Sequence, residues 1–278
     1  MRIAWIQASS MDESLAIADV AGVLKAQGHP QRLFLDRHES DLIGAVTAWK
    51  PDVAVVQAAF MAEPWLASVI RGLPTGLPTV LVGTAATFEP DLLRRVPATM
   101  AVQGELDDVL PAALSALDRG EDPTGLPGTV QWVDGALTST PWPAGPPALE
   151  PRPLPHRDLY FDPYPFLGRF PWKRFSTGRG CVHSCGFCYL PPLREGYGGA
   201  KANVRRKSVD RVLQEVAAVQ ARWPIKRIHF GDDLFAPSRA WLEEFAERWP
   251  REVGIPFTAN TSPETVTEEN ARLLGLAG

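Results

Sequence analysis

The chain has 278 residues and a mass of 30.4 kDa, a length that predicts about two domains and excludes a single small disulfide-stapled module. Hydrophobic residues make up 45%, charged residues 22%, and the mean hydropathy is −0.09, which predicts a soluble globular protein with a substantial core. The net charge of −4 gives no broad positive field for nucleic acid, and no apolar run reaches the roughly 18–20 residues of a membrane helix.

The first residues do not resemble a secretion signal. Gln7 interrupts the apolar start, and the acidic pair Asp12 and Glu13 follows before any cleavage site of small residues. This pattern predicts a cytoplasmic protein.

Short apolar runs alternate with helical patterns over residues 1–122. The expected strands are 2–8, 32–36, 52–58, 78–83 and 98–103, and the expected helices are 13–27, 40–49, 62–71, 90–95 and 106–119. Strict alternation implies right-handed crossovers and a parallel sheet covered by helices on both faces. We therefore predict a doubly wound, Rossmann-like α/β domain.

Ligands of such a domain bind at the carboxyl ends of its strands. The loops there are small and polar, and the candidate ligand-binding residues are Ser9, Ser10, Ala58, Gly83, Thr84, Gly104 and Glu105. Small residues let a flat ligand approach the backbone, although loops without a ligand tolerate them equally well, and Gly104-Glu105 also fits a turn before a helix. A Gly-x-Gly-x-x-Gly after the first strand and a Walker loop are both absent from the sequence, which argues against a nicotinamide or ATP site.

Residues 123–171 form a connector that contains 12 of the 27 prolines. Proline fixes φ and lacks a backbone donor, so regular elements are mostly excluded there. Alternating residues around Asp134-Gly135 predict one small hairpin over 128–140, and the rest is expected to run extended and dock against one or both domains.

The strongest chemical signal is the segment 178–188, which we call the cysteine loop. It holds the only cysteines of the sequence, Cys181, Cys185 and Cys188, in the pattern Cys-x-x-x-Cys-x-x-Cys, and this odd number makes a disulfide framework improbable. Three thiolates on a tight loop can each bind one iron of a 4Fe–4S cluster and leave the fourth iron open. Zinc held by the same cysteines and His183 is the alternative, although four ligands within eight residues leave little room for a tetrahedron.

The remaining residues, 172–278, alternate strand and helix again. The expected strands are 173–177, 226–230 and 256–261, and the expected helices are 209–219, 238–249 and 264–274. Three βα units are fewer than half of the eight in a full βα barrel. The open sheet edge and exposed apolar face of a partial barrel predict a fragment, a truncated reading frame or a chain that needs a partner.

The cysteine loop resembles the hallmark of the radical S-adenosylmethionine (SAM) superfamily, including Phe187 just before the third cysteine. The segment Gly231-Asp232-Asp233 is similar to the strand-end motif that receives the amino group of SAM in that superfamily. A preceding doubly wound domain, Gly104-Glu105 after its last strand and the proline-rich stretch 151–159 resemble the cobalamin-binding subfamily.

One motif of some corrinoid proteins is missing. Asp36-Arg37-His38 begins like Asp-x-His-x-x-Gly, but Asp41 occupies the glycine position, and the segment follows the second strand instead of the first. His38 is therefore not assigned as a metal ligand, and any cobalamin is expected to bind without a histidine from that motif.

The resemblance implies three cofactors: a 4Fe–4S cluster on Cys181, Cys185 and Cys188, SAM, and cobalamin. Gly231, Asp232, Asp233 and more weakly Asn260 are implied to line the SAM pocket. Reductive cleavage of SAM then yields a 5′-deoxyadenosyl radical that takes hydrogen from a small-molecule substrate, and cobalamin delivers a methyl group to that carbon. A low-potential donor, flavodoxin or ferredoxin, is also implied, and no protein side chain is assigned as catalytic. Ring formation or rearrangement, and a non-catalytic corrinoid- or zinc-binding module, are the alternatives.

Overall fold

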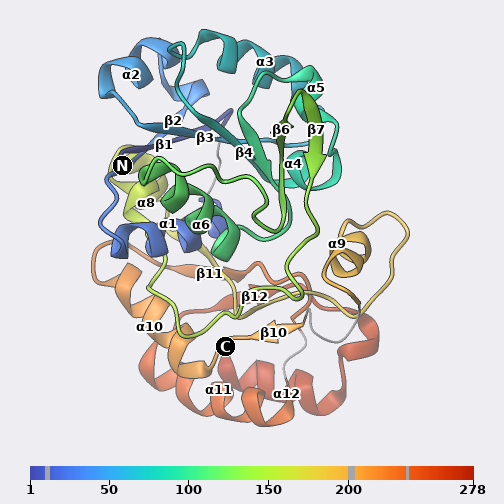
Figure 1. The fold of residues 1–278 in the computed structure, drawn as a ribbon. Coiled ribbons are helices and arrows are strands. Elements are labelled where there is room, and N and C mark those ends of the chain that lie inside the picture. The colour runs from blue at the N-terminus through green and yellow to red at the C-terminus, as the bar shows by residue number, and fades with distance from the viewer. Residues whose placement is uncertain (10–12, 200–203, 236–237) are drawn as a thin grey trace. The chain divides into compact units, whose positions relative to one another are not determined.

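A computed structural model of the chain describes residues 1–9, 13–199, 204–235 and 238–278. The chain forms two compact units, Met1–Pro147 and Ala148–Gly278, which Figure 1 draws with the chain coloured from blue to red. Ser10, one of the residues predicted to line a ligand site, lies outside the described residues.

The first unit contains a seven-stranded sheet in the order β2-β1-β3-β4-β5-β6-β7. Its strands are β1 (Ile3–Gln7), β2 (Gln31–Leu35), β3 (Val53–Gln57), β4 (Thr79–Val82), β5 (Met100–Val102), β6 (Thr129–Val133) and β7 (Ala136–Ser139). The strands β1 to β5 pair in parallel, which confirms the doubly wound α/β fold. The strand order reverses between β1 and β3, the place where ligands bind in sheets of this order.

Helices cover both faces of this sheet. They are α1 (Leu15–Ala26), α2 (Leu42–Trp49), α3 (Glu63–Gly72), α4 (Thr84–Phe88), α5 (Leu92–Arg95) and α6 (Leu106–Asp118), with a short 3-10 turn η1 (Asp36–His38). In Figure 1, α2 and α3 lie on one face, and α1 and α6 lie together on the other. Apolar side chains such as Ile6 and Val56 are fully buried against the α2 and α3 face, as the continuous apolar strands predict.

The predicted hairpin forms, but it does not stand apart from the sheet. β6 pairs antiparallel with β5, and β7 pairs antiparallel with β6, so the hairpin extends the sheet by two strands. Its turn residues Asp134 and Gly135 have φ of 49° and 78°, the left-handed values that a tight two-residue hairpin requires. The sequence indicates the turn, whereas the pairing partner depends on the tertiary fold.

The second unit begins with two short helices that the proline content argued against. These are α7 (Asp158–Phe161) and α8 (Pro165–Arg169). Proline is tolerated in the first helical turn, where Pro165 lies. Leu159, Tyr160 and Phe161 are buried, so this part of the connector belongs to a core and is not a purely extended segment.

A three-stranded parallel sheet, in the order β12-β11-β8, follows. Its strands are β8 (Trp172–Phe175), β11 (Arg227–Phe230) and β12 (Phe257–Ala259), and its main helices are α10 (Val209–Gln220), α11 (Arg239–Glu252) and α12 (Glu268–Ala277). The smaller elements are β9 (Gly178–Arg179), β10 (Arg205–Arg206), α9 (Leu190–Gly196) and the 3-10 turn η2 (Pro263–Thr265). The three predicted βα units are thus confirmed.

Aromatic side chains form the core beneath this sheet. The Phe230 ring contacts the rings of Phe235, Phe245, Trp249 and Phe257 at centroid distances between 5.4 and 5.9 Å. This cluster anchors β11, whose carboxyl end carries the Gly-Asp-Asp segment. Within the described ranges, no helix combines the length and the apolar character needed to cross a membrane.

Candidate functional site

The carboxyl ends of β8 and β11 lie side by side because the two strands pair in parallel. The backbone N–H of Gly231 donates to the carbonyl oxygen of Phe175 at 2.8 Å and continues the pairing by one residue. The segments Ser176-Thr177 and Asp232-Asp233 therefore leave the sheet at the same edge.

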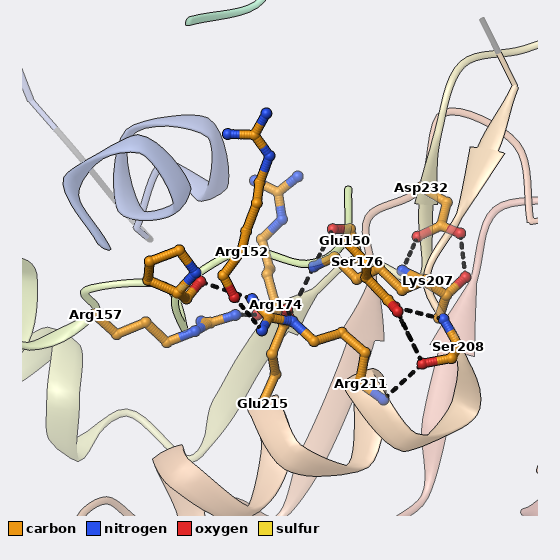
Figure 2. A network of polar contacts seen from close by, with 12 residues as sticks. Glu150, Arg152, Arg157, Arg174, Ser176, Lys207, Ser208, Arg211, Glu215 and Asp232 are labelled. Atoms are coloured by element: carbon orange, nitrogen blue, oxygen red, sulfur yellow. Dashed lines mark hydrogen bonds and ion pairs between the residues drawn. The ribbon is translucent and has the colours of Figure 1, made fainter. Parts of the chain in front are cut away.

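Asp232 is buried at this edge, with 3% of its surface exposed. Its Oδ1 accepts from the backbone N–H of Thr177 at 2.6 Å, and its Oδ2 accepts from the Thr177 hydroxyl at 2.5 Å. Burial raises the pKa of Asp232, and the hydrogen bonds from Thr177 oppose that rise. The carboxylate thus joins the two strand ends, and Figure 2 shows it facing inward among the polar side chains of this edge.

Arg206 of β10 is the charged partner of Asp232. Its Nη1 lies 3.3 Å from Asp232 Oδ2 and donates to the Thr177 hydroxyl at 2.5 Å. The guanidinium also lies over the rings of Phe235 and Trp241, at 5.6 and 5.5 Å from their centroids. Burial lowers the pKa of Arg206, and the negative charge of Asp232 opposes that change. Sequence reasoning did not select Arg206, because no motif surrounds it.

A second buried ion pair lies behind the β8 end (Figure 2). Lys207 Nζ donates to Glu215 Oε2 at 2.8 Å and to the Ser176 hydroxyl at 3.4 Å. Arg211 donates to the other Glu215 oxygen at 2.7 Å. These contacts connect helix α10 to the residue that follows β8.

Asp233 faces the start of the cysteine loop. Its Oδ2 accepts from the backbone N–H of Gly180 at 2.8 Å, and its side chain is exposed. The two neighbouring aspartates therefore differ in what they contact: Asp232 binds the strand ends, and Asp233 binds the residue just before Cys181.

The three thiols are free and accessible to different degrees. Cys181 and Cys188 are half-buried, and Cys185 is exposed. Backbone N–H groups donate to two of the sulfurs, from His183 to Cys181 Sγ at 3.4 Å and from Leu190 to Cys188 Sγ at 3.5 Å. Phe187 is 95% exposed. The loop thus presents its sulfurs and an aromatic ring at an accessible surface.

Arg194 of α9 holds the backbone of this loop. Its Nη1 donates to the carbonyl oxygens of Cys181, Val182 and His183 at 3.4, 3.1 and 3.4 Å, and its Nη2 donates to Ser184 Oγ at 2.8 Å. The guanidinium therefore contacts four consecutive residues, from Cys181 to Ser184. Sequence reasoning missed Arg194, because it lies outside the motif on a helix that was not predicted.

The donor set fits an iron–sulfur cluster. Thiolates are the protein ligands of such clusters, and hydrogen bonds to their sulfurs are a usual feature. Among the described residues, no three Cys, His, Asp or Glu side chains meet as one metal ion requires; a cubane instead takes each thiolate to a different iron. The His183 ring, proposed as a zinc ligand, contacts Ser262 Oγ through Nε2 at 3.1 Å.

Asn260 follows β12 at the same edge of the sheet. Its carbonyl oxygen accepts from the N–H of Phe235 at 2.7 Å, and the residue is exposed. This backbone contact brings Asn260 next to the segment that follows β11.

In the first unit, the loops after β3 and β4 meet. Ala58 donates its N–H to Val82 O at 2.7 Å and accepts from Ala85 N at 3.0 Å. Gly83 has a φ of 105°, and a Cβ there would lie 3.0 Å from Ala58 O, so both conformation and space favour glycine. The half-exposed Thr84 begins α4 beside them.

The other predicted residues of this unit lie at the ends of the first and fifth strands. Ser9 is exposed after β1, Gly104 donates its N–H to Thr87 Oγ1 at 3.2 Å, and Glu105 is the N-cap residue of α6. The Gln7 and Gln57 side chains are hydrogen-bonded to each other, which links the ends of β1 and β3 where the strand order reverses. Sequence reasoning did not select this pair of glutamines.

Residues 175–278 match the family model of the Radical SAM superfamily. The C-terminal part of the chain is therefore a radical SAM domain, a kind of domain that implies SAM and a 4Fe–4S cluster. The match begins at the last residue of β8 and includes the cysteine loop and the whole edge described above.

Two curated relatives match most of the chain. The uncharacterized methyltransferase PH0819 of Pyrococcus horikoshii is 26% identical over 246 residues, which are 86% of this chain and 52% of the relative. The anaerobic magnesium-protoporphyrin IX monomethyl ester cyclase of Rubrivivax gelatinosus is 25% identical over 273 residues, with 88% and 46% covered. The chain thus spans about half the length of these relatives.

Two radical SAM enzymes are among the solved structures with a similar fold. The methyltransferase TsrM from Kitasatospora setae, with cobalamin and a 4Fe–4S cluster bound, has a TM-score of 0.74 at 18% identity and covers 100% of this chain and 59% of its own. OxsB, with aqua-cobalamin and SAM bound, has a TM-score of 0.78 at 15% identity, with 99% and 42% covered. These similarities confirm the fold over both units.

Proposed function

We propose that the protein is a cobalamin-dependent radical SAM enzyme that transfers a methyl group to an unactivated carbon of a small molecule. The carrying observation is the cysteine loop, whose backbone is fixed by Arg194 and Asp233 while its three thiols stay accessible. A bound cluster supplies the electron that cleaves SAM, and cobalamin supplies the methyl group.

In this proposal, Cys181, Cys185 and Cys188 each bind one iron, and the fourth iron is left to SAM. Gly231, Asp232 and Asp233 line the pocket for the amino-acid part of SAM, with Asn260 at its margin. The Asp232 carboxylate already contacts Thr177 and Arg206, so we propose that Asp232 holds the two strand ends that shape the pocket. We propose that the exposed Asp233 binds the ammonium group of SAM.

We assign cobalamin to the first unit, at the carboxyl edge of its sheet. The support is the strand order, which reverses between β1 and β3, and the small loops there, in which Ala58 and Gly83 bring two backbones together. TsrM and OxsB, which share this fold, have structures with cobalamin bound. Ser9, Thr84, Gly104 and Glu105 complete the proposed set.

The name of the Pyrococcus relative supports methyl transfer, and the name of the Rubrivivax relative supports ring formation as the alternative reaction of the same site. Either reaction needs a small-molecule substrate and a low-potential electron donor of the flavodoxin or ferredoxin class.

The first test is cofactor loading in the Cys185→Ala variant, with Val182→Ala as the matched control because Val182 lies in the same loop without a thiol. After anaerobic reconstitution with iron, sulfide and hydroxocobalamin, we expect the wild type and Val182→Ala to hold about four irons per chain. Cys185→Ala should lose most of this iron because one ligand is gone, yet keep the corrinoid. Metal analysis and ultraviolet-visible and EPR spectroscopy measure both cofactors.

Zinc bound in place of iron would contradict the proposed iron–sulfur cluster. A wild type without corrinoid absorbance would contradict the assignment of cobalamin to the first unit. Methyl-labelled SAM, added with a chemical reductant in place of the low-potential donor, then separates the two reactions in the loaded wild type. Label found on the bound corrinoid supports methyl transfer, whereas 5′-deoxyadenosine formed without such labelling supports ring formation or rearrangement.

A further inference from the structure

The peptide unit between Val182 and His183 is bound on both of its sides. Its carbonyl oxygen accepts from Arg194 Nη1 at 3.1 Å, and its N–H donates to Cys181 Sγ at 3.4 Å. The C=O and N–H of a trans peptide point in opposite directions. This single peptide therefore connects the guanidinium of Arg194 to the sulfur of the first cysteine.

Arg194 adds a fixed positive charge to this connection. Arginine stays protonated at all ordinary pH values, and its planar group places several donors in a fixed geometry. Its contacts with the neighbouring carbonyl oxygens of Cys181 and His183 and with Ser184 Oγ restrict the guanidinium to this position. Arg194 is also half-buried, so water screens its charge less than it would at an open surface.

We propose that Arg194 is a positioning residue that makes the cluster on Cys181, Cys185 and Cys188 easier to reduce. This inference rests on the proposed function, which places the cluster there. Reduction adds one electron from a low-potential donor to the cluster and its thiolates, so the reduced form carries more negative charge. Hydrogen bonds to the sulfurs and nearby positive charge stabilise that form and raise the reduction potential.

The Val182–His183 peptide strengthens the effect of the charge. A hydrogen bond accepted by the carbonyl oxygen polarises the peptide and makes its N–H a stronger donor. Arg194 therefore acts on Cys181 Sγ through the N–H of His183 as well as through space. The contacts of Arg194 also fix the spacing between Cys181 and Cys185, because they involve every residue from Cys181 to Ser184.

The test is an EPR-monitored redox titration of the reconstituted cluster, without substrate, in Arg194→Met and Arg194→Lys. Arg251→Met is the matched control, because Arg251 is an exposed arginine of α11 that contacts Glu247. We expect Arg194→Met to lower the equilibrium constant for reduction about tenfold, which for one electron is a shift of about 59 mV to more negative potential. Arg194→Lys keeps the charge without the planar group and should lie between Arg194→Met and the wild type, while Arg251→Met should match the wild type.

An unchanged potential in iron-loaded Arg194→Met would overturn the proposal. If Arg194→Met does not hold the cluster, Arg194→Lys decides: a wild-type potential in that variant overturns the proposal, and a more negative one supports it. These outcomes differ from failure of the proposed function, in which the wild type itself does not bind about four irons per chain.

Discussion

Asp232 offers a prediction on pH dependence, because its burial raises its pKa above the ordinary value of 3.8. Between these two pKa values the folded protein binds a proton that the unfolded chain does not bind. The contribution of this proton to the free energy of unfolding is fully present below the ordinary pKa and is lost as the pH rises through the raised pKa.

Urea unfolding of the wild type and of Asp232→Asn over a series of pH values measures this contribution. We expect the free energy of unfolding of the wild type, taken relative to that of Asp232→Asn, to fall as the pH rises from the ordinary pKa of Asp232 through its raised pKa. Asp233→Asn is the control for removal of an exposed charge from the same segment. A wild-type minus Asp232→Asn difference that does not vary with pH would show that Asp232 titrates alike in both states.

The same two aspartates show how far the sequence leads at single residues. The motif indicated that the segment after β11 carries acidic groups for a ligand, but it did not indicate which carboxylate points inward. Neighbouring residues at a strand end point to different sides, and only the packing of Thr177 and Arg206 decides that Asp232 is buried. Arg194 was missed for a similar reason, because the contacts of its side chain are with a loop that precedes it in the chain.

Helix α10 depends on the buried pair of Lys207 and Glu215. Both side chains are almost fully buried, and Glu215 also accepts from Arg211, which in turn donates to the carbonyl oxygens of Arg152 and Pro153 (Figure 2). Glu215→Ala leaves the Lys207 ammonium buried without its counter-charge. We expect this variant to lose about 3–5 kcal/mol of the free energy of unfolding, measured by urea denaturation.

The double variant Lys207→Met with Glu215→Leu is the matched comparison. It removes the charges of Lys207 and Glu215 and replaces them with apolar side chains of similar size, while Arg211 keeps its bonds to the carbonyl oxygens of Arg152 and Pro153, so we expect it to recover most of the loss. A double variant as unstable as Glu215→Ala would mean that shape and not charge pairing makes this position sensitive.

Among the elements, the long periodic segments and the short helix α5 were predicted, whereas the short helices α4, α7, α8 and α9 were not. The strands of the first sheet and helices α10 and α11 follow from hydrophobic periodicity, and Ser208 and Ser238 are N-caps whose side chains accept from the third residue beyond. Helices α7, α8 and α9 have four to seven residues, too few for a periodic signal. Their formation depends on buried contacts, such as those of Tyr160 and Phe161.

At the scale of the whole molecule, two compact units with separate cores predict two unfolding transitions. Phe34 and Phe245 are both fully buried, one in each core, and each change to Ala should cost about 3–5 kcal/mol. We expect Phe34→Ala to lower only the transition of the first unit and Phe245→Ala only that of the second, measured by calorimetry and native-state hydrogen exchange. A single transition lowered by both variants would contradict independent units.

The sequence also predicts that the second unit is only part of a βα barrel. The second unit has the three predicted parallel strands, and the chain spans about half the length of its curated relatives. The labelling experiment described above tests the proposed reaction.

The sequence by itself determined the two α/β units, the order of strands and helices along the chain and the close spacing of the three cysteines, because these depend on periodicity and on spacing within a few residues. Only the tertiary structure decided that the hairpin joins the first sheet, that Asp232 is buried and that Arg194 contacts the cysteine loop. Each of these depends on which distant segments pack together, and that choice is made by burial and hydrogen bonding across the whole fold.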